Sequence, residues 1–366
     1  MQPANPFMQQ ALALAARATG LSEPNPRVGC VIVGTDGRSV LGSGHTQAAG
    51  DAHAEVMALR DAAARGFDVR GATAYVTLEP CAHHGRTPPC CDALIAAGIG
   101  KVVGSLTDPN PLVAGEGFGR LSAAGVVVET GPGAEESREL NIGFFSRMQR
   151  GVPWVRMKIA ASLDGRTALE NGASQWITSE EARTDGHAWR ARAGAVLTGI
   201  GTVLEDDPRL DVRLVSTPKQ PLAVIVDSRL ETPIDAKMFV EGRPLLIYTA
   251  EQDAKRRADL EARGAQIVLM PGAGGKVDLA AMLRDLARRE VNELHIEAGH
   301  KLNGSFIREG LVDELLVYLA PKLIGHGQGM ANIGPFTELA SALPLEFTSA
   351  TRIGPDLRVV ARVLRK

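Results

Sequence analysis

The chain has 366 residues, more than one average domain holds, so its length favours two or three domains. Hydrophobic residues make up 45% and charged residues 22%, which is ordinary globular composition. The net charge of −2 and the aromatic content of only 4% argue against a basic or base-stacking surface, so we expect no nucleic-acid partner.

The first twenty residues lack the basic start and long apolar core of a signal peptide, and no apolar run reaches the roughly 18 residues that a membrane span needs. Of the four cysteines, Cys81, Cys90 and Cys91 fall within one short motif, which fits metal binding better than a disulfide framework. We therefore expect a cytoplasmic protein with no membrane partner.

The first part of the chain alternates between strand and helix patterns. Apolar residues at helical spacing predict a helix over residues 6–19, and two prolines then break the chain at residues 24–26. Further expected elements are strands over 28–33, 40–45, 75–78, 102–103 and 126–128 and helices over 54–65 and around Leu121. This alternation predicts an α/β sheet, largely parallel or mixed.

The polar stretch 146–153 ends in Gly-Val-Pro, so we interpret it as a linker between a domain over 1–146 and a domain over 153–366. The α/β alternation restarts at Trp154. Strands are expected over 155–160, 195–199, 222–227, 245–249, 266–269, 293–297 and 314–319, with helices between several of them.

The most informative motif is His53-Ala54-Glu55 followed by Pro80-Cys81 and, later, Cys90. One imidazole and two thiolates supply three ligands to a tetrahedral zinc ion and leave one position for water, as in catalytic zinc sites. Such a zinc ion lowers the pKa of water toward about 7, and Glu55 is placed to carry its proton to departing ammonia. This is the H-x-E … P-C … C pattern of zinc deaminases.

The neighbouring residues predict how the ligands are presented. Pro88-Pro89 can start a helix, which puts Cys90 in the first turn, where the helix dipole lowers the pKa of a thiol. Cys91 is rotated by about 100° from Cys90 and should point into packing. Cys30 lies within an apolar strand, so we interpret it as a core residue.

A structural zinc site remains an alternative at this stage. It would normally have four protein ligands, and His83 or His84 could supply the fourth.

The first half of the chain resembles the deaminase domain of the bifunctional riboflavin-biosynthesis deaminase/reductase family. The matching segments are residues 24–32, 53–55, 75–81, 87–90 and 108–111. Eight residues separate Cys81 from Cys90, as in this family, whereas the general deaminase motif has C-x-x-C; this spacing argues against a tRNA or nucleotide deaminase. The resemblance implies that Asn25 contacts the substrate, although an asparagine between prolines is equally typical of a turn.

The second half lacks the G-x-G-x-x-G fingerprint of dinucleotide-binding domains. Gly199-Ile200-Gly201-Thr202 could admit a phosphate to a helix start, and an ordinary strand-to-helix turn explains it equally simply. This half nevertheless resembles the reductase domain of the same family, which is related in fold to dihydrofolate reductase. The matching segments are 157–166, 174–178, 201–203, 206–210, 226–228, 297–299, 312–315 and 320–325.

With both matches, the resemblance spans nearly the whole chain and implies a cytidine-deaminase-like three-layer α/β/α domain followed by a dihydrofolate-reductase-like α/β domain. It implies that NADPH contacts Ala160, Trp176, Thr202, Asp206, Ser228, Gly299, His300, Lys301, Leu302, Asn303, Gly304 and Ser305. It implies that the substrate contacts Ser174, Arg190, Leu210, Arg213 and Glu297. Ala298 stands where the family often has glycine, which narrows the space for the cofactor.

The implied function is a two-step enzyme that acts on small phosphoribosyl-pyrimidines, with one zinc ion and NADPH as cofactors. The deaminase would remove an amino group from 2,5-diamino-6-ribosylamino-4(3H)-pyrimidinone 5′-phosphate, and the reductase would convert the ribosyl side chain to ribityl. Arg190 and Arg213 can grip a sugar phosphate through forked hydrogen bonds. Lys158 and Asp206 are candidate proton donors.

Two other interpretations stay open at this point. One is a nucleoside or nucleic-acid deaminase with an accessory α/β domain. The other is a zinc-stabilised binding protein without catalysis, which predicts a fourth protein ligand to the metal. We also expect a homo-oligomer, because apolar strands near the C-terminus could pair subunits through a sheet edge.

Overall fold

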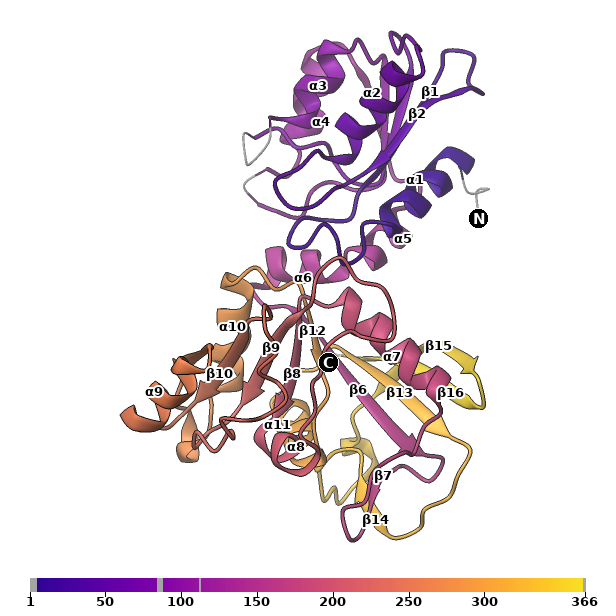
Figure 1. The fold of residues 1–366 in the computed structure, drawn as a ribbon. Helices are drawn as coiled ribbons and strands as arrows, with labels where there is room; N and C mark the ends of the chain where they lie inside the picture. Colours follow the sequence, from indigo (N-terminus) through magenta and orange to yellow (C-terminus); the bar gives the residue numbers. More distant parts are fainter. Residues whose placement is uncertain (1–4, 84–87, 112, 365–366) are drawn as a thin grey trace. The chain divides into compact units, whose positions relative to one another are not determined.

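The computed structural model describes residues 5–83, 88–111 and 113–364, which form two compact units, Met1–Val152 and Pro153–Lys366 (Figure 1). Helix α6 (Ile142–Arg150) covers most of the stretch that the sequence indicated as a linker. The composition of residues 146–153 was misleading because only the exposed end of the helix is polar, whereas Phe144 and Phe145 anchor its first turns in the core.

The first unit is built on a five-stranded mixed sheet. Its strands lie in the order β2 (Val40–His45), β1 (Gly29–Val33), β3 (Thr73–Val76), β4 (Lys101–Gly104) and β5 (Val127–Thr130). Strand β1 is antiparallel to both of its neighbours, and β3, β4 and β5 are parallel. The sheet is therefore mixed, which is one of the two arrangements expected from the sequence.

Helices cover both faces of this sheet, which gives three layers (Figure 1). Helices α1 (Pro6–Ala16) and α5 (Ala134–Leu140) lie on one face, and α2 (Ala54–Ala64), α3 (Cys90–Ala96) and α4 (Glu116–Ala123) lie on the other. Alternation along β1 produces this division: Val31 and Val33 pack with α1, and Cys30 and Ile32 pack with the residues of α2. Cys30 is a core residue, as predicted.

The second unit contains a nine-stranded sheet. The order is β11 (Ala265–Leu269), β10 (Leu245–Thr249), β9 (Leu222–Val226), β8 (Ala195–Gly199), β12 (Glu293–Ile296), β6 (Trp154–Ser162), β13 (Glu314–Ala320), β16 (Asp356–Val363) and β15 (Leu345–Ile353). The strands from β11 to β13 are parallel, and β16 is antiparallel to both β13 and β15. A separate two-stranded sheet pairs β7 (Arg166–Leu169) with β14 (Gly327–Gly329).

The helices of this unit are α7 (Glu180–Arg192), α8 (Ile200–Asp206), α9 (Ala254–Ala262), α10 (Leu279–Arg288) and α11 (His300–Arg308), with short 3₁₀ turns at Ala273–Gly275 and Leu339–Ser341. Strands β6, β8 and β12 are parallel, so their carboxyl ends meet at one edge of the sheet, where open α/β sheets usually bind ligands. Within the part of the chain that the structure describes, no helix is both long enough and apolar enough to span a membrane.

Candidate active sites

The first candidate site is a cluster of one histidine and two cysteines in the first unit. His53 is the N-cap residue of α2, Cys90 is the first residue of α3, and Cys81 lies in the loop that follows β3. The His53 Nδ1 atom lies 3.6 Å from Cys81 Sγ and 3.3 Å from Cys90 Sγ, and the three ligand atoms lie within 4.8 Å of one another. The structure thus brings together three side chains that are separated by up to 37 positions.

This donor set fits zinc. Bonds of about 2.3 Å to sulfur and about 2.0 Å to nitrogen at tetrahedral angles place such ligand atoms about 3.5 Å apart. Among the described residues, the cluster has three members, and the exposed His83 is not one of them. His84, the other residue considered as a fourth ligand, lies outside the described residues.

Backbone contacts hold the two cysteines in place. The Cys90 N–H donates to Cys81 Sγ at 3.3 Å, and the Cys91 N–H donates to the Cys81 carbonyl at 3.2 Å. The Cys91 side chain is fully buried in the core, as the rotation of its helix predicted. Helix α2 lies directly on β2, where an added Cβ at Gly42 would collide with the α2 backbone, so this glycine permits the close packing that carries His53.

Glu55 lies in the first turn of α2 and is 3% exposed. Burial, together with the nearby charge of Cys81, raises the pKa of Glu55 to about 7. Hydrogen bonds from the Cys90 thiol and the His53 ring lower the pKa of Cys81 to about 4, and the hydrogen bond shared between the sulfurs raises the pKa of Cys90. The pKa values of Glu55, Cys81 and Cys90 therefore depend on one another.

The loop beside the cluster is held by Glu79, a residue that the sequence analysis did not single out. Its buried carboxylate accepts hydrogen bonds from the N–H groups of Asp108 at 3.0 Å, Gly115 at 3.0 Å, Gly117 at 2.8 Å and Phe118 at 3.2 Å. Four N–H donors on one carboxylate fix the segment that contains Asp108. Its sequence signals were its position directly before the Pro-Cys motif and its place within the matched segment 75–81.

Two other residues of the resemblance lie in this unit. Burial raises the pKa of Asp108 to about 6. The backbone of Asn25 is tied to Ser22: its N–H donates to the Ser22 carbonyl at 2.8 Å, and its carbonyl accepts from Ser22 Oγ at 3.1 Å. These bonds are those of a turn, and a substrate contact by the Asn25 side chain remains an expectation.

The second candidate site is a cavity of about 650 Å³ in the second unit, at the carboxyl ends of β6, β8 and β12. Twelve of the residues that the resemblance implies line this cavity. They are Ala160, Ser174, Trp176, Arg190, Thr202, Asp206, Leu210, Arg213, Glu297, Gly299, His300 and Asn303. Trp176 is 63% exposed, with the guanidinium of Arg183 4.5 Å from its ring centroid.

The structure places the remaining implied cofactor residues outside the cavity lining. Ser228 follows β9, and its Oγ accepts from the Val277 N–H at 3.2 Å. On α11, His300 and Asn303 line the cavity. Four other implied residues of this helix do not: Lys301, Leu302, Gly304 and Ser305. The reason is helical geometry, because at 3.6 residues per turn a seven-residue segment cannot present every side chain to one side.

Glu297 is the centre of the charges in this cavity. Its carboxylate accepts hydrogen bonds from Arg190 Nε at 2.5 Å and Nη2 at 2.9 Å, and Lys158 Nζ lies 3.5 Å away. The fully buried His295 places Nε2 3.4 Å from the same carboxylate. Burial alone would raise the pKa of Glu297, but Arg190 and Lys158 hold that pKa well below its ordinary value. The cavity therefore contains a carboxylate that stays ionised.

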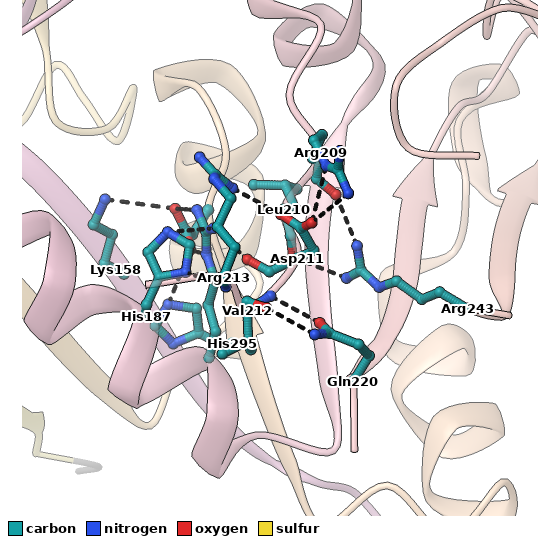
Figure 2. Close-up of polar contacts among 12 residues, drawn as sticks. Lys158, His187, Arg209, Leu210, Asp211, Val212, Arg213, Gln220, Arg243 and His295 are labelled. Carbon is teal, nitrogen blue, oxygen red and sulfur yellow. Dashed lines mark hydrogen bonds and ion pairs between the residues drawn. The ribbon is translucent and has the colours of Figure 1, made fainter. Parts of the chain in front are cut away.

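Segment 209–213 forms one wall of the cavity and is drawn in Figure 2. The Asp211 carboxylate binds Arg209 at 2.9 Å and Arg213 at 2.7 Å, and the Asp211 carbonyl accepts from Arg190 Nη1 at 3.0 Å. The Arg213 N–H donates to His187 Nδ1 at 3.1 Å. Neither Asp211 nor His187 was predicted from the sequence. Asp211 could have been found from its position next to the matched segment 206–210, whereas His187 carries no sequence signal beyond its helix.

Comparison with known proteins agrees with the division of the chain into two units. The first part matches the family model of the cytidine and deoxycytidylate deaminase zinc-binding region over residues 1–106, and the second matches the RibD C-terminal domain over residues 153–359. Over 360 residues the chain is 44% identical to the riboflavin biosynthesis protein RibD of Escherichia coli (strain K12), covering 96% of this chain and 97% of that protein. The RibD of Aquifex aeolicus (strain VF5) is 41% identical over 352 residues, with 96% of each chain covered.

Two solved structures have the same fold across both units. One is Acinetobacter baumannii RibD, with a TM-score of 0.88 and 40% identity over 98% of each chain. The other is a diaminohydroxyphosphoribosylaminopyrimidine deaminase/5-amino-6-(5-phosphoribosylamino)uracil reductase from Thermotoga maritima, with a TM-score of 0.87 and 32% identity over 98% of each chain.

Fold, sites and relatives together define the class: a bifunctional enzyme in which a zinc-binding, cytidine-deaminase-like domain precedes a reductase domain. The deaminase and the reductase activities both serve riboflavin biosynthesis. The chain belongs to the RibD family of riboflavin biosynthesis proteins. The expectations on family, fold class, activity and zinc are confirmed.

Proposed function

We propose that this chain catalyses two consecutive reactions on a phosphoribosyl-pyrimidine. It deaminates 2,5-diamino-6-ribosylamino-4(3H)-pyrimidinone 5′-phosphate and then reduces the ribosyl side chain, which gives 5-amino-6-ribitylamino-uracil 5′-phosphate. The relationship to the Thermotoga maritima deaminase/reductase supports these substrates. The observation that carries the proposal is the presence, in one chain, of the His53–Cys81–Cys90 cluster and of the cavity around Glu297.

In the deaminase step, His53, Cys81 and Cys90 hold the zinc ion and Glu55 transfers protons. When bound, zinc supplies Lewis-acid activation of a water molecule. Glu55 accepts the proton of that water and delivers it to the departing ammonia, for which its buried position beside the cluster is suited. Asn25 contacts the pyrimidine. The three ligands found among the described residues would leave one position for water, as a catalytic site requires.

In the reductase step, the residues that would hold NADPH are Ala160, Trp176, Thr202 and Asp206 together with the N-terminal turn of α11. The N–H groups of a helix start suit a phosphate, and Gly299, His300 and Asn303 line the cavity at this turn. The remaining residues implied by the resemblance would contact NADPH through their backbone or would contact its outer parts. They are Lys301, Leu302, Gly304, Ser305 and Ser228. When bound, NADPH supplies the hydride.

The substrate occupies the part of the cavity near Glu297. Arg213 is a better candidate than Arg190 for binding the substrate phosphate. The Arg213 side chain is 48% exposed and pairs with Asp211 through Nη1, whereas the more enclosed Arg190 is bound to Glu297. Ser174 and Leu210 complete the contacts. Lys158 and Asp206 both line the cavity and remain the candidate proton donors to the opened sugar.

We propose further that the domains are 1–146 for the deaminase and 153–366 for the reductase, that the enzyme works in the cytoplasm, where its four free thiols stay reduced, and that it forms a homo-oligomer. The edge strand β15 supports the last point. It is exposed on both faces and presents Phe347, which is 75% exposed. A sheet edge of this kind is a template for pairing with a second copy.

The decisive experiment incubates the purified enzyme with the diaminopyrimidinone ribotide, with and without NADPH. We expect ammonia release in both reactions and nicotinamide oxidation only after ammonia has been released, in equal final amounts. Ammonia release from RNA or a nucleoside, without release from the ribotide, would favour a nucleoside or nucleic-acid deaminase. No turnover together with a fourth protein ligand to zinc would favour a binding protein.

A further inference from the structure

The segment 209–213, hereafter the substrate loop, needs external support to keep its shape. It lies between α8 and β9 without regular secondary structure, and Arg209, Leu210 and Arg213 line the cavity. Leu210 has a φ of +50°, in the left-handed region that side chains with a Cβ rarely adopt. A residue in that conformation persists only where its surroundings hold it, and such residues gather at functional sites.

Arg243 holds the first half of this loop. It lies in the turn before β10, is 6% exposed, and directs all of its described hydrogen bonds to main-chain carbonyls. Nη1 donates to the Arg209 carbonyl at 2.7 Å and Nη2 to the Leu210 carbonyl at 2.9 Å (Figure 2). Nε donates to the Pro221 carbonyl at 3.0 Å. One planar guanidinium therefore joins both carbonyls of the strained stretch to the start of β9.

The second half of the loop has different supports. Gln220 binds Val212 twice, accepting from its N–H at 2.8 Å and donating to its carbonyl at 2.7 Å. His187 accepts from the Arg213 N–H on the opposite side (Figure 2). The two halves are joined through the Asp211 carboxylate, but their backbones are supported by different residues, so a change at Arg243 acts first on Leu210.

The surroundings of Arg243 are unfavourable for a cation. Burial lowers the pKa of Arg243 to about 10; Asp211 opposes that shift, and the charges of Arg190 and Arg209 add to it. Its hydrogen bonds go to neutral carbonyls, which compensate a buried charge less well than a carboxylate does. An apolar side chain would suffice here if packing were the only requirement. The three donors of Arg243 therefore indicate that the backbone geometry of the loop has to be fixed.

We propose that Arg243 is a positioning residue of the reductase, which holds the backbone of residues 209–210 so that Leu210 and Arg213 meet the phosphoribosyl-pyrimidine. The inference rests on the proposed function, since it assumes that this end of the cavity binds the pyrimidine. Arg243 itself lies behind the loop and does not line the cavity. Its loss should therefore weaken substrate binding without removing a reacting group.

The test is steady-state kinetics of Arg243→Gln and Arg243→Lys in the full-length enzyme. We expect the KM for the deaminated pyrimidine to rise about tenfold or more in Arg243→Gln, with the KM for NADPH within about twofold of wild type and kcat lowered less than KM rises. Arg243→Lys should lie between, because an ammonium reaches fewer of the three carbonyls at once. Ammonia release by the same chain reports that the deaminase domain is intact, and an unchanged KM for NADPH reports that the cofactor end of the reductase cavity is intact.

Arg256→Gln is the matched control. Arg256 also clamps two loop carbonyls, donating from Nε to Leu230 at 3.0 Å and from Nη2 to Thr232 at 2.6 Å, and neither of those residues lines the cavity. This variant should lose a comparable amount of thermal stability while the KM for the pyrimidine stays within about twofold.

Three results would overturn the inference. One is a pyrimidine KM in Arg243→Gln that stays within twofold while its melting temperature falls as in Arg256→Gln, which would make Arg243 purely structural. If Arg243→Gln does not fold, a wild-type KM in Arg243→Lys has the same meaning. A wild-type enzyme that oxidises no NADPH with the deaminated pyrimidine would overturn the proposed function, and this inference with it.

Discussion

A buried carboxyl beside two thiols and a histidine is the chemical core of the first domain. Helix α2 holds Glu55 in the same first turn at which His53 is the N-cap residue, so the proposed proton carrier and a proposed metal ligand are fixed by one element. The pairing follows from their spacing of two residues in the first helical turn. Their different roles follow from burial, because Glu55 is enclosed and His53 is only half-buried.

Replacing Glu55 with glutamine should abolish deamination and leave the metal in place. The amide keeps the shape of the side chain but cannot carry a proton, so we expect ammonia release to fall roughly 10²–10⁴-fold. Metal analysis should find the same zinc content as in wild type, and reduction of the deaminated pyrimidine should be unchanged. A variant that deaminates at the normal rate would show that Glu55 is not the proton carrier.

Cys90 and Cys91 offer a matched pair, because they are adjacent and face different surroundings. Cys90 belongs to the metal cluster, whereas Cys91 is enclosed by core residues. Cys90→Ala should lose most of the zinc and the deaminase activity. Cys91→Ala should keep both and lose about 1 kcal/mol of stability for the deleted buried atom. Equal zinc loss in the two variants would contradict the assignment of Cys90 as a ligand.

Glu297→Gln tests the ion cluster of the reductase. Removing one charge leaves Arg190 and Lys158 without their carboxylate in a largely enclosed site, which should cost on the order of 3 kcal/mol and most of the reductase activity. Because the pKa of Glu297 is lowered on folding, the unfolded chain binds more protons. The contribution of Glu297 to folding stability is therefore present above pH 4.5, its ordinary pKa, and is lost as the pH falls below that value.

Unfolding experiments at several pH values check this sign. The stability of the wild-type reductase domain should fall below a pH of about 4.5, and the fall should be smaller in Glu297→Gln. An equal fall in both proteins would mean that other groups control acid stability.

At the scale of elements, a buried cation aligns the three central strands of the second sheet. Arg156 on β6 is fully buried and pairs with Glu293 on β12 at 2.8 Å and with Glu314 on β13. Its guanidinium also lies 4.5 Å from the ring centroid of Trp189 on α7. Because these partners sit on separate elements, the cluster favours one register among strands that apolar side chains alone would align less specifically.

Arg156→Met should therefore destabilise the reductase domain by about 3–5 kcal/mol, since it leaves two buried carboxylates without this partner. Denaturant unfolding measures the effect. Arg257→Met is the control, because Arg257 and Glu261 form an exposed pair on α9 of the same unit, worth less than about 1 kcal/mol. An Arg156 variant as stable as the control would mean that methionine packing compensates the lost charge.

At the scale of the whole molecule, each unit has its own hydrophobic core and its own site. Removing zinc with a chelator should therefore abolish ammonia release, while NADPH oxidation with the already deaminated pyrimidine continues. Activity assays before and after zinc is restored make the measurement. Parallel loss of both activities, reversed by zinc, would show that the reductase depends on the metal site.

Much of the fold was accessible from the sequence because most strands of both sheets are short apolar runs. Strands β8 and β10 fall on the expected residues, and the helix that begins at Ala54 was expected there. Strands β15 and β16 were not predicted, because β15 is exposed on both faces and shows no alternation of apolar and polar residues. Helix α6 was taken for a linker because its outer half is polar.

By itself, the sequence determined which side chains form the His-Cys-Cys cluster, since His53, Cys81 and Cys90 lie within short motifs and need no long-range information to be found. Only the tertiary structure decided the surroundings of the second site. Lys158 meets Glu297 across 139 positions, and Arg243 reaches the substrate loop across more than 30. The physical reason is the order of the parallel strands, which brings distant carboxyl ends to one edge and leaves no local pattern to reveal it.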